Sequence, residues 1–150
     1  MNILNLKYKI KTALYKNIVE HLTKCANCFS PSLNTYVEID KYGKKIFDYA
    51  ITFESWDSNK LVGLVAVYYN NNETKAGFIT NISVLKEYQG TGIASKLIKN
   101  AIDFGRKNAF IKLMLEININ NTKAVKLYKK HGFAVVEKNK NNIIMNKEIK

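Results

Sequence analysis

The feature of the sequence that most constrains the fold is a change of hydrophobic pattern at residues 89–92, Gln-Gly-Thr-Gly. Before this change, residues 76–84 have the β-branched and apolar content of a strand. After it, apolar residues recur at helical spacing at Ile93, Leu97, Ile98, Ala101 and Ile102. The sequence therefore predicts a strand, a turn that contains two glycines, and a helix in direct succession.

The remaining segments place helices and strands on both sides of this unit. Periodicity and turn residues predict, in chain order, helices at 4–24 and 39–50, strands at 52–56, 60–69 and 76–84, a helix from 93 to near 107, a strand at 111–117, a helix at 121–130 that Gly132 ends, and strands at 133–137 and 143–145. A short strand before the first helix is left open. Antiparallel strands followed by a β-α-β unit indicate an α/β (α+β) fold, with a mixed sheet and helices on both faces.

The length and hydropathy of the chain favour one globular domain over residues 1–150, because two halves would each be too small for a sizeable core. The longest apolar stretch, residues 61–69, is about half of a membrane span. The first residues lack the apolar core of a signal peptide. We therefore expect a cytoplasmic protein with no membrane partner.

The net charge of +12 comes almost entirely from lysines, and Arg106 is the only arginine. These lysines are scattered, whereas recognition of bases and phosphates relies mostly on arginine. We therefore expect no nucleic-acid partner; a basic nucleic-acid binder is the rival, and it predicts steeply salt-dependent binding. The same charge would steer a polyanionic small molecule toward the protein.

The two cysteines form the sequence Cys25-Ala26-Asn27-Cys28, with His21 upstream. Such a pair could be a redox couple or half of a metal site. No second pair of ligands is available, because His131 is the only other histidine. We expect two reduced thiols and no metal.

The glycine turn offers a binding site for an anion. Gly90 and Gly92 allow a sharp turn that leaves backbone N–H groups exposed at the positive end of the following helix, which suits a pyrophosphate. The pattern is neither a nucleotide P-loop nor a full dinucleotide fingerprint. Taken alone, it fits a plain structural turn equally well.

A second segment, residues 115–133, resolves this ambiguity. Residues 89–94 resemble the [RQ]-x-x-G-x-[GA] pyrophosphate loop of the GNAT superfamily, the acetyl-CoA-dependent N-acetyltransferases. The helix and turn that follow residue 120 resemble the N-x-x-A-x-x-L-Y-x-x-x-G-F signature of the same superfamily at Asn121, Ala124, Leu127, Tyr128, Gly132 and Phe133. The likeness covers residues 76–145, and the motifs are most similar to those of members like the ribosomal-protein alanine N-acetyltransferases.

The resemblance implies a GNAT-type fold, in which a central, mostly antiparallel sheet is splayed where acetyl-CoA binds. The pantetheine arm would lie between the strands that end at Val84 and Ile117, and the backbone of Ile82 and Val84 would pair with its amides. The N–H groups of residues 89–94 would hold the pyrophosphate, with the Gln89 side chain assisting. The implied cosubstrate-binding residues are Ile82, Ser83, Val84, Gln89, Gly90, Thr91, Gly92, Ile93, Ala94, Ser95, Asn121 and Tyr128.

The resemblance also implies catalytic roles. Tyr128 matches the tyrosine that protonates the CoA sulfur, although a tyrosine that only packs the helix is the simpler alternative. Glu116, twelve positions earlier, matches the base of the ribosomal-protein enzymes, and strand alternation points it away from the face of Leu115. A solvated glutamate, or a water chain assisted by Asn81 or Glu54, remains open. Asn121 would cap the helix and lie near the pantetheine.

The expected reaction is direct attack of a primary amine on the acetyl thioester in a ternary complex. Residues 29–36, 53–57 and 139–142 would border the acceptor, and Glu54 and Asp57 are their only acids. We therefore expect a small neutral or anionic acceptor, such as an amino sugar or amino acid, and a monomer or homodimer. The alternatives are acetylation of protein N-termini or lysines, and a non-catalytic CoA-binding module.

Overall fold

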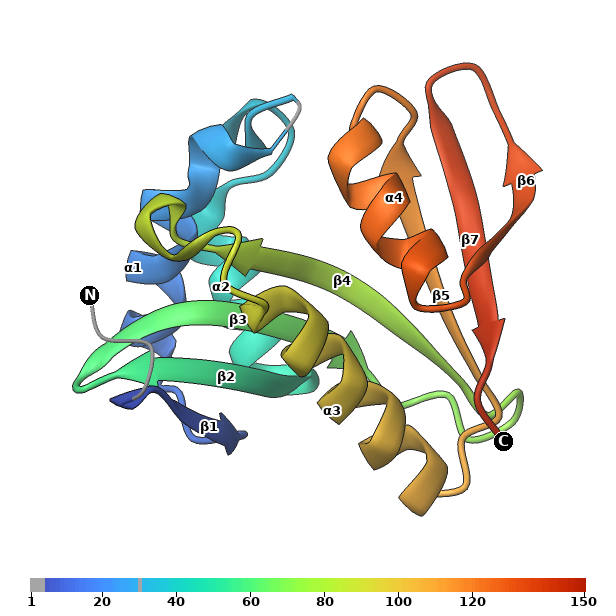
Figure 1. Ribbon diagram of the computed structural model, residues 1–150, viewed down its shortest axis with the longest axis horizontal. Coiled ribbons are helices and arrows are strands. Elements are labelled where there is room, and N and C mark those ends of the chain that lie inside the picture. The colour runs from blue at the N-terminus through green and yellow to red at the C-terminus, as the bar shows by residue number, and fades with distance from the viewer. Residues whose placement is uncertain (1–4, 30) are drawn as a thin grey trace.

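The computed structural model describes residues 5–29 and 31–150, which contain a seven-stranded sheet with helices on both faces (Figure 1). The strand order is β1-β2-β3-β4-β5-β7-β6, and each neighbouring pair is antiparallel except the parallel pair β4 and β5. The strands are β1 (Lys7–Ile10), β2 (Ile51–Asp57), β3 (Lys60–Tyr68), β4 (Ala76–Val84), β5 (Lys112–Asn118), β6 (Ala134–Lys138) and β7 (Asn142–Glu148). The helices are α1 (Tyr15–Cys25), α2 (Ile39–Tyr49), α3 (Ile93–Lys107) and α4 (Thr122–Lys130). This confirms the mixed, mostly antiparallel sheet.

The two faces of the sheet carry separate hydrophobic cores. Alternate residues of β3 supply both: Leu64 and Ala66 pack with α1 and α2, whereas Val65 and Val67 pack with α3 and α4. Among the residues that the structure describes, no helix has the length and apolar content needed to cross a bilayer.

The prediction of a first helix over residues 4–24 is wrong in its first half. Residue 4 lies outside the described residues, and Lys7–Ile10 forms the edge strand β1, paired with residues 53–56 of β2. All four side chains of β1 are exposed, including Ile10 at 46%. Although Leu6 and Ile10 have helical spacing, they do not form the buried face of a helix. Pairing with the distant strand β2 instead determines that residues 7–10 are extended. The short strand that the sequence left open is thus present.

Other elements agree with the sequence within one or two residues, apart from β7. That strand extends to Asn142–Glu148 because its whole length pairs with β5. The segment 29–36, predicted to border the acceptor, includes residue 30, which lies outside the described residues.

The parallel pair β4 and β5 is short and then splits. Residues 76–78 pair with residues 112–114, and no later residue of either strand is paired with the other. Thr80 forms a bulge in β4, since Ala66 lies opposite Asn81 while Val67 lies opposite Ile79. Bulges bend a strand and increase its twist. Figure 1 shows β4 and β5 diverging from this point, which confirms the expected splayed sheet.

A buried carboxylate anchors the start of the chain to this sheet. Glu54 in β2 has no exposed surface, and its two oxygens accept bonds from Thr12 N (2.9 Å), Ala13 N (3.0 Å), Trp56 Nε1 (3.0 Å) and the hydroxyls of Thr12 (2.5 Å) and Thr52 (2.6 Å). Burial alone would raise the pKa of Glu54, but these hydrogen bonds outweigh it and lower the pKa. The hydrogen bonds of Glu54 therefore hold the segment between β1 and α1 against the sheet.

We expect Glu54→Gln to lower the free energy of unfolding at pH 7 by about 2–4 kcal/mol, because the amide opposes several donors with its own NH₂ group. The folded-state pKa lies below the ordinary value of 4.5, so the stabilisation is present at neutral pH and is lost as the pH falls below that value. Urea unfolding at pH 7 and pH 3 should thus show that the difference in unfolding free energy between wild type and Glu54→Gln is smaller at pH 3 than at pH 7. Glu38→Gln, which removes only an exposed pair with Lys41, is the control. A difference independent of pH would contradict this account.

Candidate functional site

The free edge of β4 faces the split between β4 and β5. The Leu85 N–H donates to the Val62 carbonyl of β3 (2.9 Å), so in the antiparallel ladder the backbone groups of Ser83 also face β3. The groups of Ile82 and Val84 point the opposite way, into the split. These two residues can therefore pair with an extended ligand, as the sequence predicted for them.

The segment from Gln89 to Ser95 follows this edge after the short helical turn Lys86–Tyr88, and it comprises a loop and the first residues of α3. Gly90 (φ +77°) and Gly92 (φ +86°) have left-handed backbones, and a Cβ at either position would meet nothing within 4 Å. Gly92 is the N-cap of α3 and provides no side-chain cap. Among the described residues, none accepts a hydrogen bond from the backbone N–H groups of residues 90–95. Open space, free donors and the helix dipole together form a cradle for an anion.

Side chains of the loop brace it against its neighbours. Gln89 Nε2 donates to the Val84 carbonyl (3.1 Å), Thr91 Oγ1 donates to the Tyr88 carbonyl (2.5 Å), and Ser95 Oγ lies 3.0 Å from His131 Nε2. Lys123 of α4 reaches across to Gln89 Oε1 (3.4 Å). Lys123 thus adds a cation beside the cradle, which sequence reasoning missed because the contact spans two motifs.

Tyr128 approaches the split from α4. Its side chain is buried, and its ring packs edge-on against Phe133 with 5.7 Å between centroids. Gly132 (φ +90°) ends α4 and lets the Phe133 N–H bond to the Tyr128 carbonyl (3.0 Å), which confirms the predicted helix end. Burial and the nearby Tyr42 of α2 raise the pKa of Tyr128, so its phenol stays protonated at neutral pH.

Glu116 lies on the opposite face of β5 from Tyr128. It is exposed, whereas its neighbour Leu115 is buried in the same core as Tyr128, as strand alternation predicted. Its Oε2 accepts a hydrogen bond from Asn142 Nδ2 (2.9 Å) at the start of β7. A carboxylate and a phenol therefore lie on opposite faces of the sheet at β5.

Asn121 occupies the N-cap position of α4, but its side chain forms no cap bond with another described residue. This differs from the predicted role. Its backbone has φ −83° and ψ 64°, outside the extended geometry from which an asparagine reaches the first turn. Its carbonyl accepts the Val125 N–H (3.0 Å), so the backbone alone starts the helix.

A buried chain of polar groups runs from α1 to β4. His21 Nδ1 lies 2.9 Å from the Leu61 carbonyl, His21 Nε2 lies 2.9 Å from Ser83 Oγ, and Ser83 Oγ lies 2.8 Å from Asn81 Oδ1. Burial lowers the pKa of His21 to about 4, so the imidazole is neutral. Asn81 Nδ2 is buried without a partner among the described residues.

Counting protons along this chain defines the orientation of the Asn81 amide. The Leu61 carbonyl requires the imidazole proton on Nδ1, so Nε2 of neutral His21 must accept the Ser83 hydroxyl proton. Ser83 Oγ then has no proton left for Asn81 and must accept one from it. The amide nitrogen therefore belongs beside Ser83, since the two amide ends are nearly isosteric and the network decides between them. The Asn81 carbonyl oxygen is then the unpaired end.

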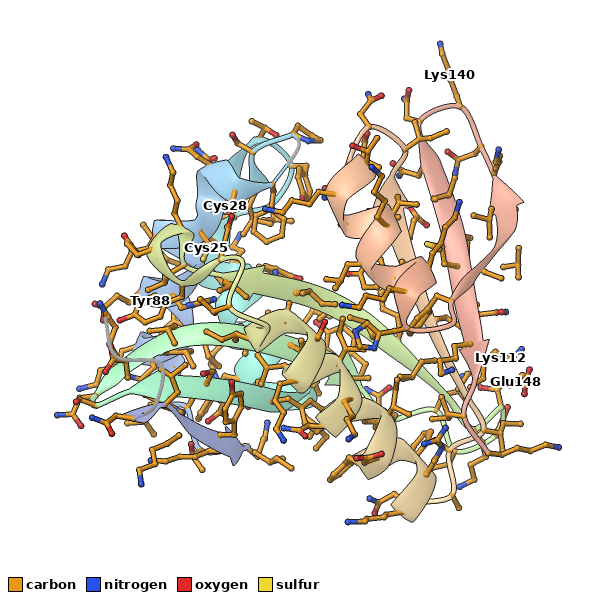
Figure 2. The ribbon with its side chains drawn as sticks, viewed as in Figure 1. Cys25, Cys28, Tyr88, Lys112, Lys140 and Glu148 are labelled. Atoms are coloured by element: carbon orange, nitrogen blue, oxygen red, sulfur yellow. The ribbon has the colours of Figure 1, made fainter. Side chains whose placement is uncertain are left out.

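The cysteines form no disulfide; Cys25 is buried and Cys28 is exposed, at the end of α1 (Figure 2). Burial, with a contribution from Cys28, raises the pKa of Cys25 to about 12, so it is an unreactive thiol. This confirms the prediction of two free thiols. Within residues 5–29 and 31–150, no three His, Cys, Asp or Glu side chains gather as a metal site would require.

Comparison with known proteins gives this fold and site a family. Residues 15–133 match the acetyltransferase (GNAT) family, so the chain belongs to it and is an N-acetyltransferase-type acyltransferase. N-alpha-acetyltransferase 30 of Schizosaccharomyces pombe is 26% identical over 102 residues, covering 63% of this chain and 68% of that protein. Streptothricin acetyltransferase A of Bacillus subtilis is 30% identical over 97 residues, covering 65% of this chain and 51% of that protein.

A solved structure agrees with the fold. The ribosomal-protein-S18-alanine N-acetyltransferase from Escherichia coli has a TM-score of 0.77 at 17% identity, over 95% of this chain and 94% of that one. The alignment to the streptothricin enzyme spans only about half of that relative. The family uses acetyl-CoA, and the free edge of β4 with the open cradle of residues 89–95 fits such a molecule.

Proposed function

We propose that the protein transfers an acetyl group from acetyl-CoA to the primary amine of a small neutral or anionic acceptor. The observation that carries this proposal is the split beside β4, which leads directly to a cradle of unpaired N–H groups at the start of α3. All seven strands join one sheet, which supports a single domain over residues 1–150.

The donor residues have distinct roles in this proposal. Ile82 and Val84 would pair with the pantetheine amides, and the N–H groups of Gly90 to Ser95 would bind the pyrophosphate. Gln89 would hold the cradle against β4 through the Val84 carbonyl. Ser83, whose hydroxyl bonds to His21 and Asn81, would position the strand rather than touch the ligand. Acetyl-CoA supplies an activated thioester, and Asn121 would lie beside its pantetheine.

The protein side chains would move the protons of the reaction. Glu116 would accept the proton that the acceptor amine loses as it attacks, directly or through water. Tyr128, protonated because burial raises its pKa, would donate its phenol hydrogen to the CoA sulfur as the C–S bond breaks and would then regain a proton from water. The two residues lie on opposite faces of β5. One could therefore remove a proton from the acceptor amine on one face while the other donates a proton to the CoA sulfur on the opposite face.

The charges around the acceptor side disfavour a strongly cationic substrate. The predicted acceptor segment 53–57 lies on β2, which β3 separates from β4, so Glu54 and Asp57 do not border the split; Glu54 is buried and saturated with donors, and Asp57 accepts the Tyr88 hydroxyl. With a net charge of +12, the protein would repel a basic peptide during encounter. The similarity to a streptothricin acetyltransferase supports a small acceptor, while the similarity to an N-alpha-acetyltransferase supports protein N-termini as the second candidate.

Replacing Gly92 tests the donor site. We expect Gly92→Val to weaken CoA binding by at least about tenfold, or 1.4 kcal/mol, because its side chain would fill the space above the cradle. Gly132→Val is the matched control, since Gly132 has an equally left-handed backbone (φ +90°) at the far end of α4. Calorimetric titration with CoA should separate the two variants. An unchanged affinity in Gly92→Val would remove the basis of the proposal.

Tyr128→Phe tests the acid. We expect kcat to fall by roughly 10²-fold, within the usual range for a positioned acid, while CoA affinity stays near that of the wild type. Tyr8→Phe, on the edge strand β1, is the control. CoA release measured with a panel of amines is the assay. Full turnover in Tyr128→Phe would leave Tyr128 as a packing residue, and CoA binding without any release would identify a non-catalytic module.

Glu116→Gln tests the base. We expect kcat/KM to fall by about 10–10²-fold while CoA affinity is retained, because the amide keeps the bond to Asn142 but accepts no proton. Glu137→Gln on β6 removes an exposed acid outside the split and serves as the control. Equal loss in both variants would indicate a general charge effect and favour a water chain as the base.

A further inference from the structure

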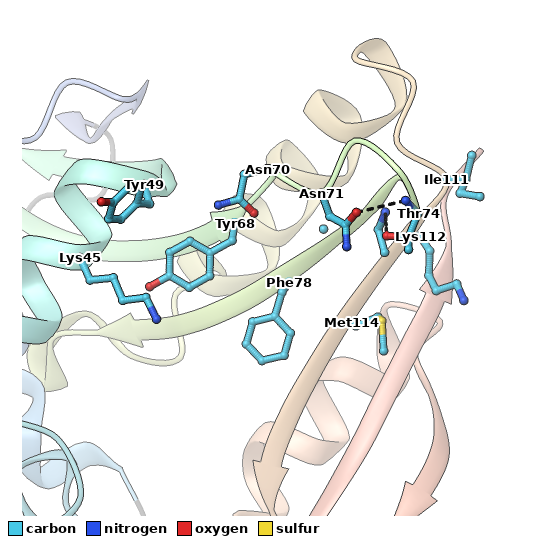
Figure 3. A pocket seen from close by; sticks show the side chains of 12 residues that line it. Lys45, Tyr49, Tyr68, Asn70, Asn71, Thr74, Phe78, Ile111, Lys112 and Met114 are labelled. Atoms are coloured by element: carbon cyan, nitrogen blue, oxygen red, sulfur yellow. Dashed lines mark hydrogen bonds between the residues drawn. The ribbon is translucent and has the colours of Figure 1, made fainter.

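A cavity of about 590 Å³ lies on the α2 face of the sheet, where β4 and β5 are still paired (Figure 3). It is bounded by the end of α2, the end of β3, the β3–β4 turn, and the first residues of β4 and β5. Its lining includes Lys45, Tyr49, Tyr68, Phe78, Lys112 and Met114.

The cavity adjoins the point where the strands separate. Phe78 and Met114 form the last pair of the β4–β5 ladder, and both side chains line the cavity. Glu116 follows two residues after Met114 on the same face of β5, about 7 Å farther along the strand. A molecule whose amine reached Glu116 could therefore extend its body into the cavity.

The walls suit a flat apolar group. Phe78 is 40% exposed and Tyr49 63% exposed, although both are large aromatic side chains. In Figure 3 the ring of Phe78 lies between Tyr68 and Lys45 on one side and the thioether of Met114 on the other. Aromatic rings and methionine sulfur both favour contact with an aromatic ring.

The polar groups of the cavity suit an anion. Lys45 Nζ lies 5.4 Å from the centroid of the Tyr68 ring, and Lys45 has no ion-pair partner among the described residues. None of the residues that line the cavity is acidic. The second cation, Lys112, lies opposite Glu148 in the β5–β7 pair (Figure 2), but the two form no ion pair, so both lysines present positive charge to the cavity. Tyr68 Oη is buried without a partner in the described structure, so the Tyr68 ring rather than its hydroxyl faces the cavity.

We propose that this cavity binds the body of the acceptor: an aromatic ring between Tyr68, Phe78 and Met114, with a carboxylate at Lys45 and the primary amine at the split. The inference rests on the proposed acetyl transfer and narrows its acceptor to arylalkyl primary amines that carry an acid group. Lys45 and Phe78 are specificity residues in this arrangement, and neither takes part in the proton transfers.

Three amines test the proposal on the intact protein: 4-(2-aminoethyl)benzoate, 2-phenylethylamine without the carboxylate, and 4-aminobutyrate without the ring. We expect kcat/KM for the first to exceed that of each other amine by at least about tenfold, since it alone engages both the ring site and Lys45. Lys45→Gln should remove the preference over 2-phenylethylamine, and Phe78→Ala the preference over 4-aminobutyrate. Lys41→Gln, one turn away on the same helix and 81% exposed, should retain both preferences.

Direct binding separates this inference from the proposed function. Titration with 4-ethylbenzoate, which has no amine, should show binding that weakens at least about fivefold in Lys45→Gln, where a charge partner is lost, and not in Lys41→Gln. Acetylation of other amines without these preferences would overturn the acceptor assignment while the acetyltransfer stands. Failure to bind CoA would instead overturn the function, even if 4-ethylbenzoate bound. A dimer that Phe78→Ala dissociates, with acceptor preferences unchanged, would show that a second copy covers the cavity and would also overturn the proposal.

Discussion

The short pairing of β4 with β5 is the constraint on which the rest of the structure depends. The two parallel strands share three residue pairs and then separate at the Thr80 bulge. Beyond that point β4 has an unpaired backbone edge, and an unpaired edge inside a domain must find a partner or face solvent. An extended ligand amide satisfies that edge as another strand would. The cradle of residues 89–95, Tyr128, Glu116 and the acceptor cavity are all placed around this opening.

Polar contacts hold the two sides of the opening in position: a buried chain on one side, and more exposed contacts on the other. On the α1 side, the chain through His21 and Ser83 holds the Asn81 amide in one orientation, with its carbonyl oxygen unpaired. On the α4 side, Lys123 contacts Gln89 and His131 contacts Ser95, so α4 is tied to the start of α3 by two polar contacts. Because an unpaired buried polar group is costly, the buried chain through His21, Ser83 and Asn81 favours a single arrangement of this side of the site.

Charge connects the site to its proposed substrates. The acids of the predicted acceptor segment 53–57 lie on β2, which β3 separates from β4, and they serve the fold: Glu54 anchors the chain before α1, and Asp57 accepts the Tyr88 hydroxyl. The cations remain free on the surface, with Lys123 beside the cradle and Lys45 at the cavity. The positive electrostatic field of the protein would therefore attract both an anionic donor and an anionic acceptor. The same field would repel a basic acceptor.

Local pattern by itself determined much of this protein. The spacing of apolar residues predicted three of the four helices and most strands within one or two residues, and the two motifs located the cradle loop, Tyr128 and Glu116. These features depend on residues close together in the chain.

Tertiary structure decided the remaining features. Residues 7–10 form a strand because they pair with residues 53–56, and His21 reaches Ser83 across 62 positions of sequence. The cavity likewise combines α2 with β3, β4 and β5. The spacing of apolar residues within one segment does not reveal which distant segment it will contact. That partner is defined only when the chain folds and brings the two segments together.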